Sequence, residues 1–290
     1  MMKRFFLIFF LLLSVAGVSK AQDTYFPYPQ PPDTIQSIEN RTAYFIQHFW
    51  DRCNFKNAFS SKARLGDAFK DYIQIIGTST DSIVFPAVDN FMHSLDKLPE
   101  QQAFFVEQAE KELYSDSAQF FNDKLYIAFA NPMLQNKKVK KEFKLRPQRL
   151  VDILSGSAVG ARVPLLEYTD RDGKKGSTKD DIAQLVVYFF NDPDCDDCLM
   201  TRMQLYTDIK ASQMIRDGVL KVVSIYPGEY SEEWAAKVKS YPEEWRVVAA
   251  PDAEDVYDLR MLPTFYIMNG NKIRIKGANI QQVLNVINVL

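Results

Sequence analysis

The chain is poor in the side chains that hold metals or cross-link small folds. It has three cysteines and two histidines in 290 residues. Three cysteines are too few for a fold that depends on several disulfides. A structural zinc site typically uses four Cys or His ligands, and His48 and His93 lie in a different half of the chain from Cys195 and Cys198. We therefore expect no metal site, and metal binding by this cysteine pair stays a minor alternative.

The sequence also lacks a strong excess of either charge. Its formal net charge is -2 and its pI is about 5.8, whereas a nucleic-acid-binding domain is usually basic. A local basic run, KKVKKEFK, occupies residues 137–144. Such a run more often forms a solvated helix face or a linker than a phosphate-binding surface. We expect no nucleic-acid partner.

Long apolar runs are missing except at the start of the chain. Residues 5–18 are apolar, follow Lys3 and Arg4, and lead to the small-residue triplet at 19–21. This layout is typical of a secretory signal peptide, and the run is shorter than the roughly 20 residues of a membrane-spanning helix. We expect residues 1–21 to be removed after Ala21. With no cysteine near that point to accept a lipid, the mature protein should have no membrane anchor and should be periplasmic or otherwise extracytoplasmic.

The first half of the chain shows helical periodicity with almost no strand-like alternation. The Pro-rich residues 22–33 favour an extended conformation and are interpreted as a spacer. After them, apolar residues recur at helical spacing, as in Leu65, Phe69, Tyr72, Ile73 and Ile76. Helices are predicted over residues 35–53, 62–76, 82–98, 99–114 and 118–135. An all-helical domain over residues 34–154 follows from this pattern.

The second half, residues 155–290, alternates short apolar or β-branched runs with helical segments, which is typical of an α/β sheet. Strands are predicted at 163–168, 183–190, 220–226, 246–249, 264–268 and 272–276. The turn at 170–173 joins the first of these to a further short strand, and Asn269-Gly270 joins the last two as a tight hairpin. Helices are expected from the cysteine pair onward, over 231–239, and from Asn279.

Cys195 and Cys198 form a Cys-x-x-Cys pair after a buried strand and at the start of a helix. In that context the pair indicates thiol–disulfide chemistry. Free backbone N–H groups and the positive end of the helix dipole favour a thiolate at the first cysteine. Cys195 is therefore the candidate attacking thiolate. Cys198, about one turn later, is the candidate resolving thiol that breaks the mixed disulfide.

These residues, together with Leu262-Pro263-Thr264 before the last hairpin, resemble the TlpA-like family of exported thiol-disulfide oxidoreductases over residues 155–290. The resemblance implies a thioredoxin-like fold, a mixed sheet flanked by helices. It also implies that Pro263 is cis, faces the cysteines and, with its two neighbours, positions the client peptide. The helical half, including YFIQHFWDRCNF, is similar to a helical domain of unknown function that precedes thioredoxin-like domains in exported bacterial proteins.

The site departs from that family pattern at three positions. Asp194 and Asp197 stand where active members usually have Trp and often Pro, and Phe189 stands where thioredoxin has a buried acid. The base for the resolving step is therefore unassigned. Asp194, Asp196 and Asp197 oppose formation of a thiolate at Cys195, and a less stable thiolate favours the disulfide. We expect these acids to tune the pair to a reducing potential, below about -200 mV.

The function predicted from the sequence is reduction or exchange of disulfides in client proteins. The expected partners are client thiols and disulfides and, as a source of electrons, a membrane thiol-reducing donor; no cofactor is expected. The alternative is a thioredoxin-like binding or structural module whose Cys195–Cys198 disulfide is not catalytic. Cys53 is interpreted as a small packed hydrophobe rather than a third redox partner.

Overall fold

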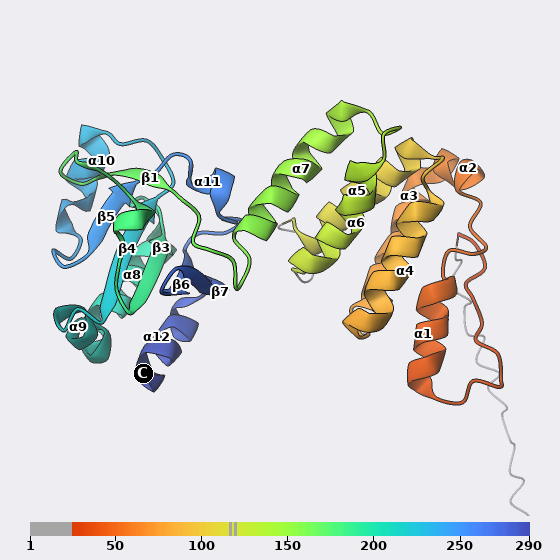
Figure 1. Cartoon of the computed structure of the whole chain (residues 1–290), viewed down its shortest axis with the longest axis horizontal. Helices are drawn as coiled ribbons and strands as arrows, with labels where there is room; N and C mark the ends of the chain where they lie inside the picture. Colours follow the sequence, from red (N-terminus) through yellow and green to blue (C-terminus); the bar gives the residue numbers. More distant parts are fainter. Residues whose placement is uncertain (1–24, 116–117, 119–120) are drawn as a thin grey trace, which may run out of the picture.

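The computed structural model describes residues 25–115, 118 and 121–290, and Figure 1 shows them as two bodies joined through α7. The expected signal peptide, residues 1–21, lies outside the described residues. Within the described part of the chain, no helix is long and apolar enough to cross a membrane.

The N-terminal body contains helices only. They are α1 (Ile38–His48), α2 (Phe55–Ala58), α3 (Lys62–Ile76), α4 (Asp81–Ser94), α5 (Pro99–Leu113), α6 (Asp123–Gln135) and α7 (Lys141–Gly156). The predicted helix at 62–76 is confirmed to the residue. The helix expected over 118–135 begins later, because the side chain of Asn122 accepts a hydrogen bond from the Leu125 N–H at 3.0 Å and caps the first turn.

The sequence pattern did not predict α7. The lysines at its start and Pro147 hide its apolar stripe, which lies in the second half of the helix and buries Leu150, Val151, Ile153 and Leu154. The basic run at 137–144 contributes the solvated first turn of this helix. Helix α7 leads from the helical body to the sheet.

Aromatic side chains form the core of the helical body. Trp50 stacks on Phe91 with ring centroids 4.7 Å apart, and Phe105 meets both at an angle. The segment interpreted as a spacer joins this core from residue 25 onward. Phe26 is buried against Phe49, and the Tyr28 hydroxyl donates to Asp71 at 2.8 Å. These residues of the Pro-rich segment therefore pack on the helices.

The C-terminal body is a seven-stranded mixed sheet with strand order β2-β1-β5-β4-β3-β6-β7. Its strands are β1 (Glu167–Asp170), β2 (Lys175–Ser177), β3 (Leu185–Phe190), β4 (Leu220–Tyr226), β5 (Arg246–Ala249), β6 (Thr264–Asn269) and β7 (Lys272–Ala278). Strands β3, β4 and β5 are parallel, and the remaining pairs are antiparallel. The strands predicted at 220–226 and 246–249 are confirmed to the residue.

Helices cover the sheet: α8 (Asp196–Thr207), α9 (Ile209–Arg216), α10 (Glu232–Lys237), α11 (Ala253–Val256) and α12 (Ile280–Val289). Every residue of β3 is buried, with Val187 and Phe189 in one apolar cluster and Tyr188 and Phe190 in another. The central strand is therefore covered on both faces, as its uninterrupted apolar run predicts. Helices α9 and α11 are short and were not predicted.

Candidate functional site

The two cysteines lie just beyond the carboxyl end of β3. After Phe190, the Asn191 N–H donates to the carbonyl of Ile225, which keeps the chain beside β4 for one more residue. A tight turn follows, in which the Cys195 N–H donates to the Asp192 carbonyl at 3.2 Å. The Asp192 side chain accepts from the Asp194 N–H at 2.8 Å. Helix α8 begins directly after this turn, at Asp196.

Cys195 is the N-cap residue of α8. Its sulfur accepts a hydrogen bond from the backbone N–H of Cys198 at 3.2 Å. The first N–H groups of a helix lack partners within the helix, so a sulfur placed there receives both a hydrogen bond and the positive end of the helix dipole. Both cysteines are free thiols, and Cys195 is half-buried whereas Cys198 is only 2% exposed. A reactant can reach the first sulfur more easily than the second.

Burial raises the pKa of the Cys198 thiol to about 12, and a hydrogen bond with Cys195 adds to the shift. A thiol with this pKa stays protonated near neutral pH, so it is a poor nucleophile until a proton is removed. The two sulfurs therefore differ in their exposure, and the less exposed one belongs to a thiol whose pKa is raised.

The Leu262–Pro263 peptide bond is cis, as the family resemblance implies. Thr264, the next residue, opens β6 and lies opposite Phe190, the last residue of β3. The loop that contains Pro263 and the loop that contains the cysteines therefore leave the sheet at the same end and on neighbouring strands. Leu262 packs against the apolar cluster on one face of the sheet.

Comparisons with known proteins concern the two domains as folds. Residues 14–157 match the family model of a domain of unknown function, DUF5106. The whole structure is similar to the crystal structure of a thioredoxin-like protein from Bacteroides caccae. That similarity has a TM-score of 0.72 and 24% identity, over 91% of this chain and 98% of the other. The first half of the chain is thus similar to DUF5106, and the second half has a thioredoxin-like fold.

Two further solved structures are similar to part of the chain. One is a conserved protein of unknown function from Bacteroides fragilis, with 29% identity and a TM-score of 0.43 over 45% of this chain and 98% of the other. The other is the thioredoxin domain of a thiol-disulfide oxidoreductase from Bacteroides vulgatus, with 19% identity and a TM-score of 0.40 over 46% of this chain and 96% of the other. Among curated proteins, none matches the sequence.

The acids beside the cysteines of the thioredoxin-like domain differ in their surroundings. Asp194 forms an ion pair with Lys237 of α10 at 2.8 Å, and Lys237 also contacts Glu233 at 3.1 Å. Asp196 and Asp197 are exposed in the first turn of α8, where acids stabilise a helix through its dipole. A cation thus partly offsets the charge of Asp194, which the sequence argument had counted in full.

A buried polar network lies next to the cysteine loop. The Asn191 amide donates to the Phe189 carbonyl and to the Ser224 hydroxyl, each at 2.8 Å. The Asn191 carbonyl oxygen accepts from the Tyr241 hydroxyl at 3.1 Å. Sequence reasoning missed this network, although a polar residue directly after an apolar strand was a signal for Asn191.

Arg202 places a cation beside the same network. It follows Cys198 by four residues on α8, and its guanidinium lies 3.7 Å from the centre of the Tyr241 ring. Burial raises the pKa of Tyr241 to about 12, while the nearby Arg202 charge lowers it. Phe189, where thioredoxin has a buried acid, stacks on Phe265 at 4.7 Å. The polar groups nearest the buried thiol thus come from the cysteine loop, α8 and the segment before β5.

Exposed apolar side chains follow the cysteines along α8, and another precedes Pro263. Leu199, Met203 and Tyr206 follow one another at helical spacing on α8, and Met200 lies beside them. Met261, two residues before Pro263, is 59% exposed. Flexible thioether side chains adapt to differently shaped partners. The apolar rim on α8 therefore consists of exposed side chains that follow Cys198 along the helix.

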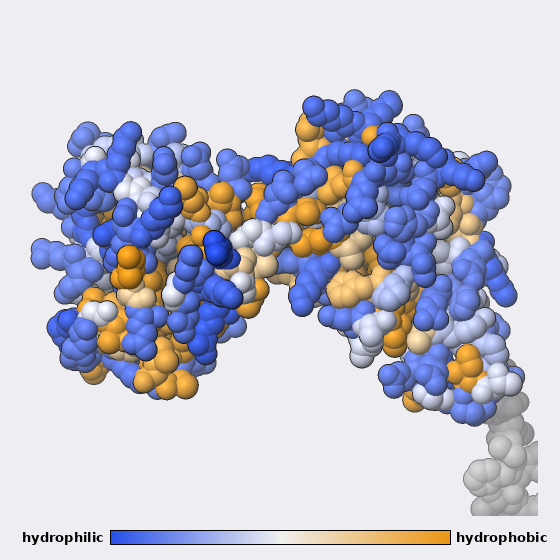
Figure 2. All heavy atoms as spheres, viewed as in Figure 1, coloured by the Kyte–Doolittle hydropathy of each residue, from blue (hydrophilic) through white to orange (hydrophobic). Residues whose placement is uncertain are grey.

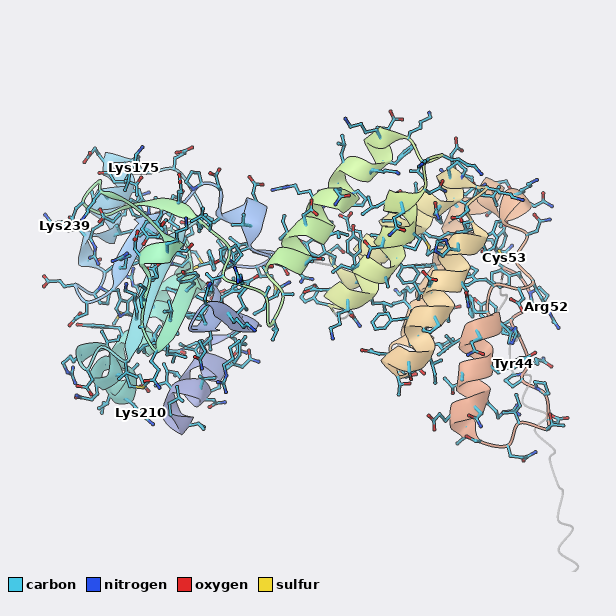
Figure 3. All side chains as sticks on the ribbon, in the orientation of Figure 1. Tyr44, Arg52, Cys53, Lys175, Lys210 and Lys239 are labelled. Carbon is cyan, nitrogen blue, oxygen red and sulfur yellow. The ribbon has the colours of Figure 1, made fainter. Side chains whose placement is uncertain are left out.

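Cys53 takes no part in this site. It lies in the helical domain (Figure 3), half-buried against the aromatic core, and burial raises the pKa of its thiol to about 12. His48 and His93 are on exposed helix surfaces of the same domain, paired with Asp51 and with Asp89 and Asp96.

Proposed function

We propose that the protein is an exported thiol-disulfide oxidoreductase that reduces or exchanges disulfides in client proteins. The observation that carries the proposal is the placement of Cys195. Its sulfur caps a helix and accepts a hydrogen bond from the N–H of Cys198. It lies at the end of the sheet where the cis-Pro263 loop leads into β6. Export rests on the signal-like residues 1–21, and a periplasmic location is part of the proposal.

The proposed reaction has two exchange steps. The Cys195 thiolate attacks a client disulfide, forms a mixed disulfide and releases one client sulfur as a thiolate. Cys198 then loses its proton to a base or to water and attacks the Cys195 sulfur. This second step forms the Cys195–Cys198 disulfide and releases the other client sulfur. Two electrons pass from the pair to the client, and a thiol donor of the membrane would return them.

Client contact is assigned to two neighbouring surfaces. The Leu262-Pro263-Thr264 segment would lie along the client backbone, and the apolar rim on α8 would hold client side chains. A half-buried attacking sulfur between these surfaces favours an extended, locally unfolded client.

The experiment is reduction of insulin disulfides by the purified mature protein with dithiothreitol as electron donor. Cys195→Ser is expected to abolish the acceleration over dithiothreitol alone. Cys198→Ser is expected to abolish turnover and, when the reduced protein is mixed with insulin after dithiothreitol has been removed, to accumulate mixed disulfides through Cys195. Cys53→Ser is the matched control and should retain wild-type activity. Full activity in the Cys195→Ser protein would refute the proposal.

A second candidate is a thioredoxin-like binding module with a structural Cys195–Cys198 disulfide. The side chain of Phe189, where a proton-accepting acid would be useful, favours it. In that case no variant changes insulin reduction, because the wild type has no activity to lose.

A further inference from the structure

A cavity of about 430 Å³ lies between the two domains, beside the loop that contains Pro263. The helical domain contributes the end of the segment before α6 and its first turn. The thioredoxin-like domain contributes the loop before β6 and the end of β7. The lining residues that matter most are Phe121, Asp123, Lys124, Arg260, Met261 and Thr264. Figure 2 shows the surface hollowed between the domains.

Four charged side chains hold the walls of this cavity in place. Arg260 donates to Asp123 at 2.8 Å and to Asp258, and Lys276 forms ion pairs with the same two carboxylates. Asp123 belongs to the helical domain and the other three to the thioredoxin-like domain. Because the side chains of Asp258, Arg260 and Lys276 are largely buried, removing one partner would leave an uncompensated buried charge, which costs more than at the surface. These ion pairs thus fix the shape of the cavity where the two domains meet.

The lining carries an excess of positive charge. Arg260 and Lys276 are matched by Asp123 and Asp258, but exposed Lys124 adds a third cation. The Nη1 atom of Arg260 is also buried with no hydrogen-bond partner among the described residues. Leaving a buried donor of this kind without an acceptor has a free-energy cost. An entering acceptor, such as a carboxylate, would recover that cost.

Two exposed apolar side chains lie at the same place. The Phe121 ring is 43% exposed and covers the guanidinium of Arg260, with 4.4 Å from the guanidinium carbon to the ring centre. Met261 stands on the opposite wall and is 59% exposed. The Tyr114 ring also lies 4.4 Å from this guanidinium carbon, so the cation contacts two aromatic rings. The cavity therefore offers apolar contact beside a cation.

The cavity continues the thiol site. Met261 and Thr264 line it, and they flank the Leu262–Pro263 pair that borders the cysteine loop. An extended chain advances by about 3.3 Å per residue. A client joined to Cys195 and lying across the Pro263 loop would therefore extend toward the cavity.

We propose that this cavity binds the client segment next to the attacked cysteine, and that it favours a segment with an acidic side chain beside an apolar one. The inference rests on the proposed function and adds a role for the helical domain, whose residues 121–124 form one wall. The helical domain then selects clients instead of acting only as a spacer.

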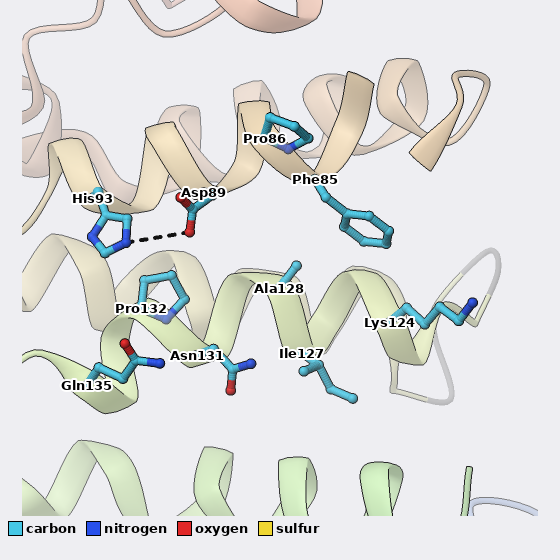
Figure 4. Close-up of a pocket in the computed structure, with 10 residues that line it drawn as sticks. All are labelled: Phe85, Pro86, Asp89, His93, Lys124, Ile127, Ala128, Asn131, Pro132 and Gln135. Atoms are coloured by element: carbon cyan, nitrogen blue, oxygen red, sulfur yellow. Dashed lines mark ion pairs between the residues drawn. The ribbon is translucent and has the colours of Figure 1, made fainter. Parts of the chain in front are cut away.

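The helical domain also has a larger cavity, of about 660 Å³, between α4 and α6. Figure 4 shows Lys124 at its far end from the His93–Asp89 ion pair. This second cavity does not border the Pro263 loop. Lys124 lines both cavities, so a client that passes the Pro263 loop meets Lys124 before it meets His93.

The experiment uses short peptides whose single cysteine is linked to 2-nitro-5-thiobenzoate. Attack by Cys195 forms the peptide mixed disulfide and releases coloured thionitrobenzoate, so the rate is read by absorbance in the full mature chain with Cys198→Ser. One peptide set carries Glu-Leu near the cysteine and the matched set carries Lys-Leu, on either side. The protein with the wild-type cavity lining should react about fivefold faster with the acidic set than with the basic set at low salt. This preference should shrink as salt is added.

Lys124→Glu tests the helical wall, because the side chain is exposed and leaves the Arg260 cluster intact. We expect it to remove the preference for acidic peptides. Lys70→Glu, an exposed lysine of α3 away from the cavity, is the matched control and should keep the preference. Equal rates for both peptide sets, or a preference that Lys124→Glu leaves unchanged, would overturn the inference.

Neutral 2-hydroxyethyl disulfide separates the two proposals, since it is too small to span the thiol and the cavity. If it reacts with Cys195 while the peptide preference is absent, the proposed function stands and the cavity inference is wrong. If Cys195 reacts with neither probe, both are wrong.

Discussion

Phe190 and Thr264 lie opposite each other as the last residue of β3 and the first residue of β6. This single pairing brings together two loops that are far apart in the sequence. One carries the cysteines and the other carries cis-Pro263. Because adjacent strands are about 4.8 Å apart, whatever binds along one loop is next to the other. The chemistry proposed for Cys195 depends on this arrangement.

The raised pKa of Cys198 predicts that this thiol resists alkylation. Because burial raises it to about 12, we expect iodoacetamide to leave Cys198 unmodified in the native reduced protein at pH 7 to 9 and to label it only in strong alkali. Cys53 should resist in the same way, because burial raises its pKa to about 12 as well. Mass spectrometry of the labelled peptides gives the rate at each cysteine. Rapid labelling of Cys198 at pH 7 would contradict the burial argument.

Asn191 is predicted to be important for stability. Asn191→Ala leaves the Ser224 and Tyr241 hydroxyl groups without their partner in a buried site. Each unsatisfied buried group costs about 1–3 kcal/mol, so we expect a loss of about 2–4 kcal/mol in the free energy of unfolding. Urea unfolding followed by circular dichroism measures it. Tyr241→Phe removes only one of these hydrogen bonds and should lower the free energy of unfolding by about 1 kcal/mol. Equal losses in the two variants would contradict the central position of Asn191 between Ser224 and Tyr241.

Lys237 is predicted to raise the reduction potential of the cysteine pair. Its ion pair with Asp194 offsets a negative charge next to Cys195. Lys237→Ala should leave that charge uncompensated, disfavour the thiolate and shift the potential to a more negative value. Asp194→Ala should shift it in the opposite direction. Equilibration with glutathione redox buffers measures both, and Lys239→Ala, an exposed lysine two residues further on, serves as the control.

Much of the thioredoxin-like domain could be predicted because its signals are local. The runs at 220–226 and 246–249 are apolar, bounded by polar or turn residues, and they match β4 and β5 to the residue. Helix α7 was not predicted because lysines and Pro147 interrupt its first half, so its buried stripe is short. Helix α9 follows α8 directly at Asp208, where the sequence offers no glycine or proline to mark the break.

The contacts that complete the site are not local, and the sequence could not reveal them. Tyr241 reaches Asn191 across 50 positions, and Arg260 reaches Asp123 across 137. Such pairs follow from the packing of whole elements, which a periodic pattern does not specify. The acids around Cys195 show the same limit. Their charges could be predicted from the sequence, whereas the ion pair between Lys237 and Asp194 could not.

The thioredoxin-like side of the domain contact is predicted to lose stability in acid, and the contact itself is predicted to weaken on loss of Asp123. Burial alone raises the pKa of Asp258, but the hydrogen bond from Arg260 and the charges of Lys276 and Arg260 outweigh it and hold that pKa below its ordinary value. A carboxyl whose pKa is lower in the folded state stabilises the fold above its unfolded pKa of about 4. That stabilisation is lost as the pH falls below about 4 toward the folded pKa.

Asp123→Asn removes the carboxylate that joins Arg260 and Lys276 to the helical domain. Two largely buried cations then share Asp258 alone, and we expect the free energy of unfolding to fall by about 1–3 kcal/mol at pH 7. Asp255→Asn is the matched control, because its ion pair with Arg149 also joins the domains but both side chains are more than half exposed. An exposed pair of this kind contributes less than about 1 kcal/mol. Urea unfolding at pH 7 compares the two, and an equal loss in both variants would mean that the buried cluster does not hold the domains together.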